Sequence, residues 1–121
     1  MNYDSLAIVA SKSRAGVAFT IARMSFGRRM ELIRRIRELA SKAEFLDAGS
    51  TLGEKLEGAL LSTQVDRLYL NWGLIGIEGL EIDGSPATPE LLAAAGPEDL
   101  FHEAVQAVKG ECGLSDEERK N

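Results

Sequence analysis

The chain of 121 residues carries a formal net charge of −5, and 45% of it is hydrophobic and 27% charged. These values are typical of a single globular domain, which at this length buries about two-thirds of its unfolded surface. No apolar run is long enough for a membrane span, and the acidic start is unlike a secretory signal, so we expect a cytoplasmic protein without membrane contact. A lone cysteine, Cys112, excludes an internal disulfide.

The charge is unevenly distributed along the chain. Residues 12–42 contain nine Lys and Arg against two acids, whereas residues 43–121 contain five against sixteen. The protein is therefore predicted to have a basic front part and an acidic back part, a property that bears on solubility and partners rather than on fold.

Residues 1–25 predict a β-hairpin. The apolar run LAIVA is followed by KSRAG, a turn in which Gly16 can adopt a positive φ. Val17, Phe19 and Ile21 then alternate with smaller or polar residues, which predicts a strand with one buried face. Two strands alone are marginal in water, so this face must pack against another part of the chain.

A first helix is predicted over residues 26–48. Ser25 is a favourable N-cap because its hydroxyl can accept a hydrogen bond from an early backbone N–H, and Gly49 favours the C-terminal end. Steps of three and four residues define its predicted buried stripe, which consists of Met30, Ile33, Ile36, Ala40 and Ala43.

A second helix is predicted over residues 52–72, with Thr51 or Ser50 as its N-cap. Its predicted buried stripe consists of Leu61, Val65, Leu68 and Trp72, with Leu56 and Leu60 just beside it. Of these two helices, the first is basic and the second is close to neutral.

Residues 73–88 form a glycine-rich connector with a short extended segment, in which Asp83-Gly84 predicts a turn. A phosphate-binding loop would need a Lys and a Ser or Thr after its glycines, whereas here Glu78 and Glu81 would repel phosphate. We therefore interpret the glycines as sites of turns and close backbone approach, and we expect no nucleotide cofactor.

Two further helices are predicted in the acidic residues 89–121. Thr88 caps the first, which begins at Pro89 and ends at Gly96, and the second follows directly and ends at Gly113. The predicted buried face of the second consists of Phe101, Val105, Val108 and Cys112. The whole pattern predicts one α+β domain, mostly helical, with an N-terminal β-hairpin and a short central extended segment.

The residue types needed for catalysis or metal binding are sparse. His102 is the sole histidine, and it lies ten residues from Cys112, about 15 Å along a helix, so the two cannot share a zinc ion. Glu78, Glu81 and Asp83 are predicted to form a solvated strand edge rather than an acid–base pair. The sequence thus predicts no enzyme, no metal site and no cofactor.

An arginine-rich face is the most distinctive candidate site. It lies on the first helix and consists of Arg28, Arg29, Arg34, Arg35 and Arg37. Three interpretations remain open: a solvated face with ion pairs such as Glu31–Arg35, a surface that docks an acidic protein, including a second copy, or a phosphate-binding face for nucleic acid. The net charge of −5 counts against nucleic acid.

Three short motifs follow the arginine-rich helix: Trp72-Gly73, Ile82-Asp83-Gly84 and Thr88-Pro89. With the order hairpin, basic helix, Trp-Gly segment, acidic turn and capped helix, the chain resembles the small tail assembly chaperones of tailed phages and prophages over residues 17–121. The resemblance implies a non-enzymatic protein that binds the long helical tape-measure protein and keeps its apolar surfaces from aggregating. It also implies self-association, which some members of the family show.

Within this interpretation, two surfaces are expected to contact the partner. They are the arginine-rich face and the segment around the tryptophan, so the predicted contact residues are Arg28, Arg29, Arg34, Arg35, Arg37, Trp72, Leu74 and Ile75. Two other functions stay open. One is a structural subunit of the virion, such as a tail or head-joining protein that uses the hairpin as an arm, and the other is a small nucleic-acid-binding regulator.

Overall fold

The fold is α+β and mostly helical, with an N-terminal β-hairpin, as predicted. The computed structural model describes residues 1–47 and 51–112, and the side chains of all of these except 42–47 and 62. Its elements in chain order are β1 Leu6–Ala10, β2 Ala18–Ala22, α1 Phe26–Asp47, α2 Leu52–Gly73, β3 Leu74–Glu78, β4 Glu81–Ile82, β5 Ser85–Pro86, α3 Pro89–Ala95 and α4 Glu98–Cys112. Among these residues, no helix combines the length and apolar character that crossing a membrane requires. The helix ends predicted at Gly49 and Gly113 lie outside the described residues.

The hairpin strands β1 and β2 share an antiparallel sheet with β3, in the order β1-β2-β3. Phe19 pairs with Val9 on one side and Ile77 on the other, and the face that holds Phe19 and Ile21 is buried, as the alternation predicts. β3 lies in the segment predicted as a connector. The structure makes it the third strand of the sheet, because β2 offers it a row of backbone groups that β1 does not use.

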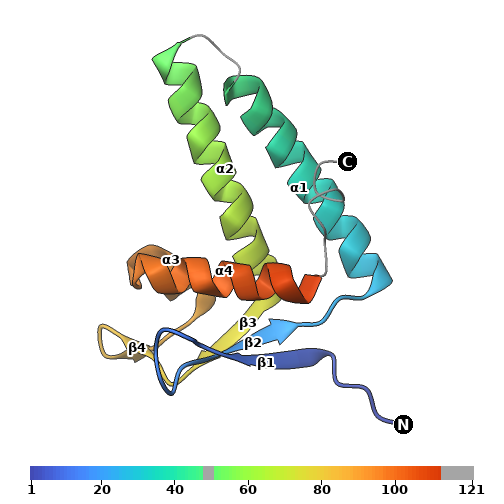
Figure 1. The fold of residues 1–121 in the computed structure, drawn as a ribbon, viewed down its shortest axis with the longest axis vertical. Coiled ribbons are helices and arrows are strands. Elements are labelled where there is room, and N and C mark those ends of the chain that lie inside the picture. Colours follow the sequence, from blue (N-terminus) through green and yellow to red (C-terminus); the bar gives the residue numbers. More distant parts are fainter. Residues whose placement is uncertain (48–50, 113–121) are drawn as a thin grey trace.

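α1 and α2 pack side by side as a helical hairpin that projects from the sheet, whereas α4 lies across the sheet with α3 beside it (Figure 1). The predicted buried stripe of α1 is partly wrong: Leu32 and Ile36 are buried, but Met30 is 42% exposed. Ile33 packs against the core only in part. Two neighbouring apolar stripes run along α1, one with Met30 and Ile33 and one with Leu32. Because of the way α1 packs on α2, the stripe that contains Leu32 is the buried one.

The core lies where α2, α4 and the sheet meet. Tyr69 and Leu70 of α2 are almost completely buried there, although neither belongs to the predicted stripe. The stripe residues Val65, Leu68 and Trp72 are half-buried and pack against this core. The predicted stripe therefore contacts the core, but the deepest positions of α2 lie beside it.

The buried face of α4 is largely the predicted one. Val105, Val108 and Cys112 are buried, and Phe101 is half-buried. Gly73 lets α4 cross close to the end of α2, because a Cβ at that position would lie 2.5 Å from the Cγ1 atom of Val108. The glycine at the end of the second helix thus serves close packing as well as termination.

The predicted caps and the central turn are confirmed. The side-chain oxygens of Ser25, Thr51 and Thr88 accept hydrogen bonds, at 3.1 to 3.2 Å, from the backbone N–H groups of Arg28, Glu54 and Leu91. Asp83 and Gly84 both have positive φ, 53° and 81°, and join β4 to β5 in a two-residue turn, the geometry that an Asp-Gly pair favours. These local signals fix where α1, α2 and α3 begin.

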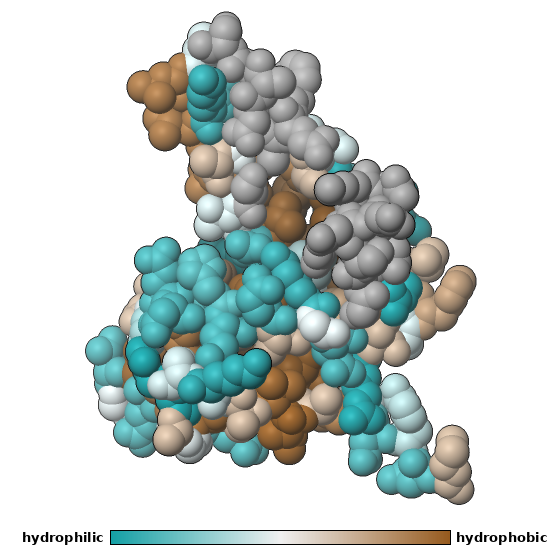
Figure 2. Space-filling view, in the orientation of Figure 1, coloured by the Kyte–Doolittle hydropathy of each residue, from teal (hydrophilic) through white to brown (hydrophobic). Residues whose placement is uncertain are grey.

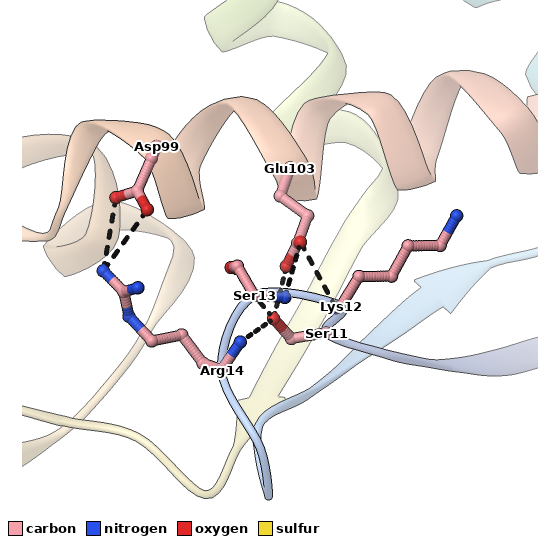
Figure 3. A network of polar contacts seen from close by, with 6 residues as sticks. All are labelled: Ser11, Lys12, Ser13, Arg14, Asp99 and Glu103. Atoms are coloured by element: carbon pink, nitrogen blue, oxygen red, sulfur yellow. Dashed lines mark hydrogen bonds and ion pairs between the residues drawn. The ribbon is translucent and has the colours of Figure 1, made fainter.

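Glu103 of α4 holds the turn between β1 and β2 (Figure 3). Its carboxylate accepts hydrogen bonds from the Ser11 hydroxyl and from the backbone N–H groups of Lys12 and Ser13, the last two at 3.3 and 3.2 Å. These bonds lower the pKa of Glu103, and the Ser11 hydroxyl contributes most. The ionised Glu103 carboxylate therefore connects the β1–β2 hairpin to α4, the helix that covers the sheet.

Candidate partner-binding surface

Arg28 and Trp72, both predicted to contact a partner, contact each other. The Arg28 Nη2 atom donates a hydrogen bond to the Trp72 carbonyl oxygen at 2.8 Å, and the guanidinium carbon lies 4.5 Å from the centroid of the indole ring. Both side chains are half-buried. The arginine therefore binds the C-terminal end of α2, where a cation also favours the helix dipole.

Arg29 makes the equivalent contact with a different helix. Its Nη2 atom donates to the Cys112 carbonyl oxygen at 2.9 Å, at the C-terminal end of α4. Arginine side chains near the C-terminal end of a helix can donate hydrogen bonds to its last carbonyl groups. Two successive arginines at the start of α1 thus join it to the ends of α2 and α4, which is a structural role that the sequence analysis did not foresee.

The other three arginines of the predicted surface are exposed. Arg34, Arg35 and Arg37 project from α1, and the predicted ion pair between Arg35 and Glu31 is present. At about 100° per residue, Arg34 lies opposite the buried Leu32 and Ile36 on the helix. The exposed part of the arginine-rich face therefore consists of these three side chains.

The two predicted contact residues after Trp72 point in different directions. Leu74 is only 3% exposed and belongs to the core, whereas Ile75 is 51% exposed. The register between β2 and β3 shifts between Thr20 and Ile21, so Ile75 lies at an irregularity in the ladder. Of this pair, only Ile75 offers its side chain to a partner.

A row of exposed leucines on α2 is an apolar surface that does not belong to the predicted contact residues. Leu52, Leu56 and Leu60 of α2 are 73%, 63% and 57% exposed, and we call them the leucine row. Successive members differ by about 40° around the helix, so the row occupies one face over about 12 Å. Figure 2 shows the apolar surface at the tip of α2, at the upper left. The spacing of four residues identifies the row in the sequence as an apolar face, but it does not show that the face is uncovered.

A cleft of about 430 Å³ lies between α2, α3 and α4, beyond the C-terminal end of the leucine row. Thr63 and Arg67 form the side of the cleft contributed by α2. They follow Leu60 by three and seven residues, so they lie on the same face of the helix. Leu92 and Phe101 supply apolar surface from the other two helices. The row and the cleft therefore form one elongated surface along α2.

Charged side chains border this cleft. Asp66 binds the Lys109 Nζ atom at 3.1 Å, and the same Nζ atom lies 5.0 Å from the centroid of the Tyr69 ring. The His102 Nε2 atom lies 3.6 Å from a carboxylate oxygen of Glu98. In the part of the chain that the structure describes, no three His, Cys, Asp or Glu side chains cluster as metal ligands. The cleft thus combines apolar surface from Leu92 and Phe101 with polar and charged side chains from α2 and α4.

The chain matches no protein-family model, no curated protein and no solved structure. The function is therefore inferred from three surface features: the leucine row, the cleft and the exposed arginines.

Proposed function

We propose that the protein is a non-enzymatic assembly chaperone of the phage-tail type, which acts in the host cytoplasm and binds the helical tape-measure protein before the tail tube forms around it. The leucine row is the observation that carries the proposal. Its three exposed leucines lie on a helical hairpin that projects from the rest of the fold (Figure 1). A surface of this kind suits a protein whose role is to cover apolar side chains of another.

The geometry of α2 supports a helical partner. Leu52, Leu56 and Leu60 repeat every four residues, and an amphipathic helix that lies along α2 would present its own apolar stripe at a matching interval. Each leucine that becomes buried contributes roughly 1.5–3 kcal/mol. The cleft beyond Leu60 extends this contact and ends at polar groups, which favours a defined position of the partner.

The exposed arginines support association with an acidic partner. Arg34 and Arg37 project from α1, the other helix of the projecting hairpin. Exposed charges of this kind raise association rates and discriminate between partners more than they add affinity. We assign them the role of orienting the tape-measure protein, and the leucine row the role of holding it.

Co-expression with a long helical tape-measure protein tests the proposal. We expect the tape-measure protein to become more soluble and to copurify with the chaperone. Unchanged solubility without a complex would contradict it.

Two further outcomes would favour the alternatives. Stoichiometric presence of the protein in mature particles would indicate a structural subunit, although the hairpin that could act as its arm is bound to α4 by Glu103. Salt-sensitive retention of duplex DNA would indicate a nucleic-acid-binding regulator.

A further inference from the structure

β1 has an open edge. Among the described residues, β1 ends the sheet order and pairs only with β2. The backbone bonds Arg23 N–H to Ser5 O and Ser11 N–H to Val17 O, both at 2.8 Å, show that the odd-numbered residues of β1 face β2. In an antiparallel ladder the alternate residues face the other way. The N–H and C=O groups of the even-numbered residues therefore point outward.

We propose that β1 pairs antiparallel with β1 of a second copy, about a two-fold axis at Ile8. In this register Ile8 lies opposite Ile8 of the second copy, and Leu6 lies opposite Ala10. All of these residues have outward-facing backbone groups, so each opposed pair can exchange both of its hydrogen bonds. The two three-stranded sheets would become one continuous sheet of six strands, closed by an isologous contact.

The charges that flank β1 match this register. Asp4 and Lys12 lie two residues outside the two ends of β1, at equal distances in sequence from Ile8. The two-fold axis therefore brings Asp4 of one copy to the same end of the paired strands as Lys12 of the other. Both are exposed, and in the described part of the chain neither charged group has an ion-pair partner. Figure 3 shows the Lys12 side chain extending away from Glu103, although its backbone N–H binds that residue. The pairing would supply two ion pairs per dimer.

The side chains of β1 also suit a strand partner. Leu6 and Ile8 are exposed on the outer face of the sheet, Ile8 at 69%, and would lie beside their counterparts. On the inner face, a groove of about 320 Å³ between β1 and α4 is lined by Val9 and Phe19 among others. Ala7 of the second copy would lie opposite Val9 and is small enough to enter this groove. β1 has neither charge nor proline, the devices that block the pairing of edge strands.

Exchange of the charged residues Asp4 and Lys12 tests the pairing of the two β1 strands and its register. The mass of the wild-type protein is measured by sedimentation equilibrium at low salt, together with D4K, K12D and the double variant D4K/K12D. We expect a wild-type dimer whose dissociation constant rises about tenfold in each single variant, because like charges then meet at two places in the dimer. The double variant should return to within about threefold of wild type. A monomer at every concentration, or a double variant no tighter than the singles, would overturn the proposal.

Disulfide crosslinking of introduced cysteines gives a second test of the register. I8C should form an intermolecular disulfide on mild oxidation, because directly opposed, hydrogen-bonded residues have Cα atoms about 5.5 Å apart, within the range of a disulfide. T20C is the matched control, on the same face of β2 and about 14 Å from its counterpart by three strand spacings. Crosslinking of T20C as fast as I8C, or none of I8C, would contradict the register. Neither position belongs to the leucine row, so failure here leaves the chaperone proposal intact.

Discussion

The Arg28 guanidinium stacks on the Trp72 indole at 4.5 Å and donates a hydrogen bond to the carbonyl of the same residue at 2.8 Å. One side chain thus fixes both the ring and the last turn of α2, while its neighbour Arg29 binds the end of α4. The start of α1 is thereby fixed to the ends of two other helices. Arg28, Arg29 and Trp72 therefore connect α1 to α2 and α4, whereas their predicted contact with a partner stays a prediction.

Replacement of Arg28 by alanine should lower the free energy of unfolding by about 1–3 kcal/mol. The loss combines the half-buried cation–π contact with a hydrogen bond from a charged donor. Denaturant unfolding monitored by Trp72 fluorescence measures it, and the emission of the folded protein should also shift. The control is R34A on the exposed side of α1, which should change stability by no more than about 0.5 kcal/mol. Equal effects of the two variants would contradict the structural role of Arg28.

Glu103 should make the protein less stable in acid. Its pKa is lowered in the folded state from the ordinary value of 4.5, so the unfolded state binds the proton more tightly. The resulting stability is present above about pH 4.5 and is lost as the pH falls through the lower folded pKa. Thermal unfolding between pH 3 and pH 7 measures this, with pH values chosen to bracket the ordinary carboxyl range.

The matched comparison for Glu103 is with an exposed glutamate of α2. E103Q should reduce stability at pH 7 by about 1 kcal/mol and flatten the acid dependence, whereas E57Q should leave both nearly unchanged. A profile for E103Q that falls as steeply in acid as the wild type would show that another group is responsible.

Gly79 should tolerate no side chain. It has a φ of 79°, and a Cβ there would overlap the carbonyl oxygen of Gly16 in the hairpin turn. G79A should therefore cost about 2 kcal/mol or more, from the left-handed conformation and the displaced turn. G76A, in the same segment but with open space around its Cα, should be neutral or stabilising by up to about 1 kcal/mol. Similar unfolding midpoints for the two variants would argue against this close contact.

Local features of this fold are readable from the sequence because their causes lie within a few residues. Thr88 and Pro89 specify the start of α3 through one side-chain hydrogen bond and one fixed φ. Asp83-Gly84 specifies its turn in the same way. The alternation of Phe19 and Ile21 likewise identifies the buried face of β2.

Features that depend on distant residues could not be predicted. β3 joins the sheet because β2 pairs with it across two intervening helices, whereas the sequence predicted only a short extended segment in this region. The contacts of Arg28 and Arg29 depend on where the ends of α2 and α4 arrive in space. The leucine row was missed because periodicity identifies an apolar face without indicating whether anything covers it.

Capture of the tape-measure protein by a leucine-row variant tests the central claim most directly. The variant combines Leu52→Gln, Leu56→Gln and Leu60→Gln, which keep helix propensity. Its control is F26Q, which removes an apolar side chain that is 81% exposed at the start of α1. Both should show wild-type circular dichroism. We predict that the triple variant binds the tape-measure protein about a hundredfold more weakly or worse, while F26Q binds like the wild type. Undiminished capture by a folded triple variant would contradict the claim that the leucine row is the binding surface.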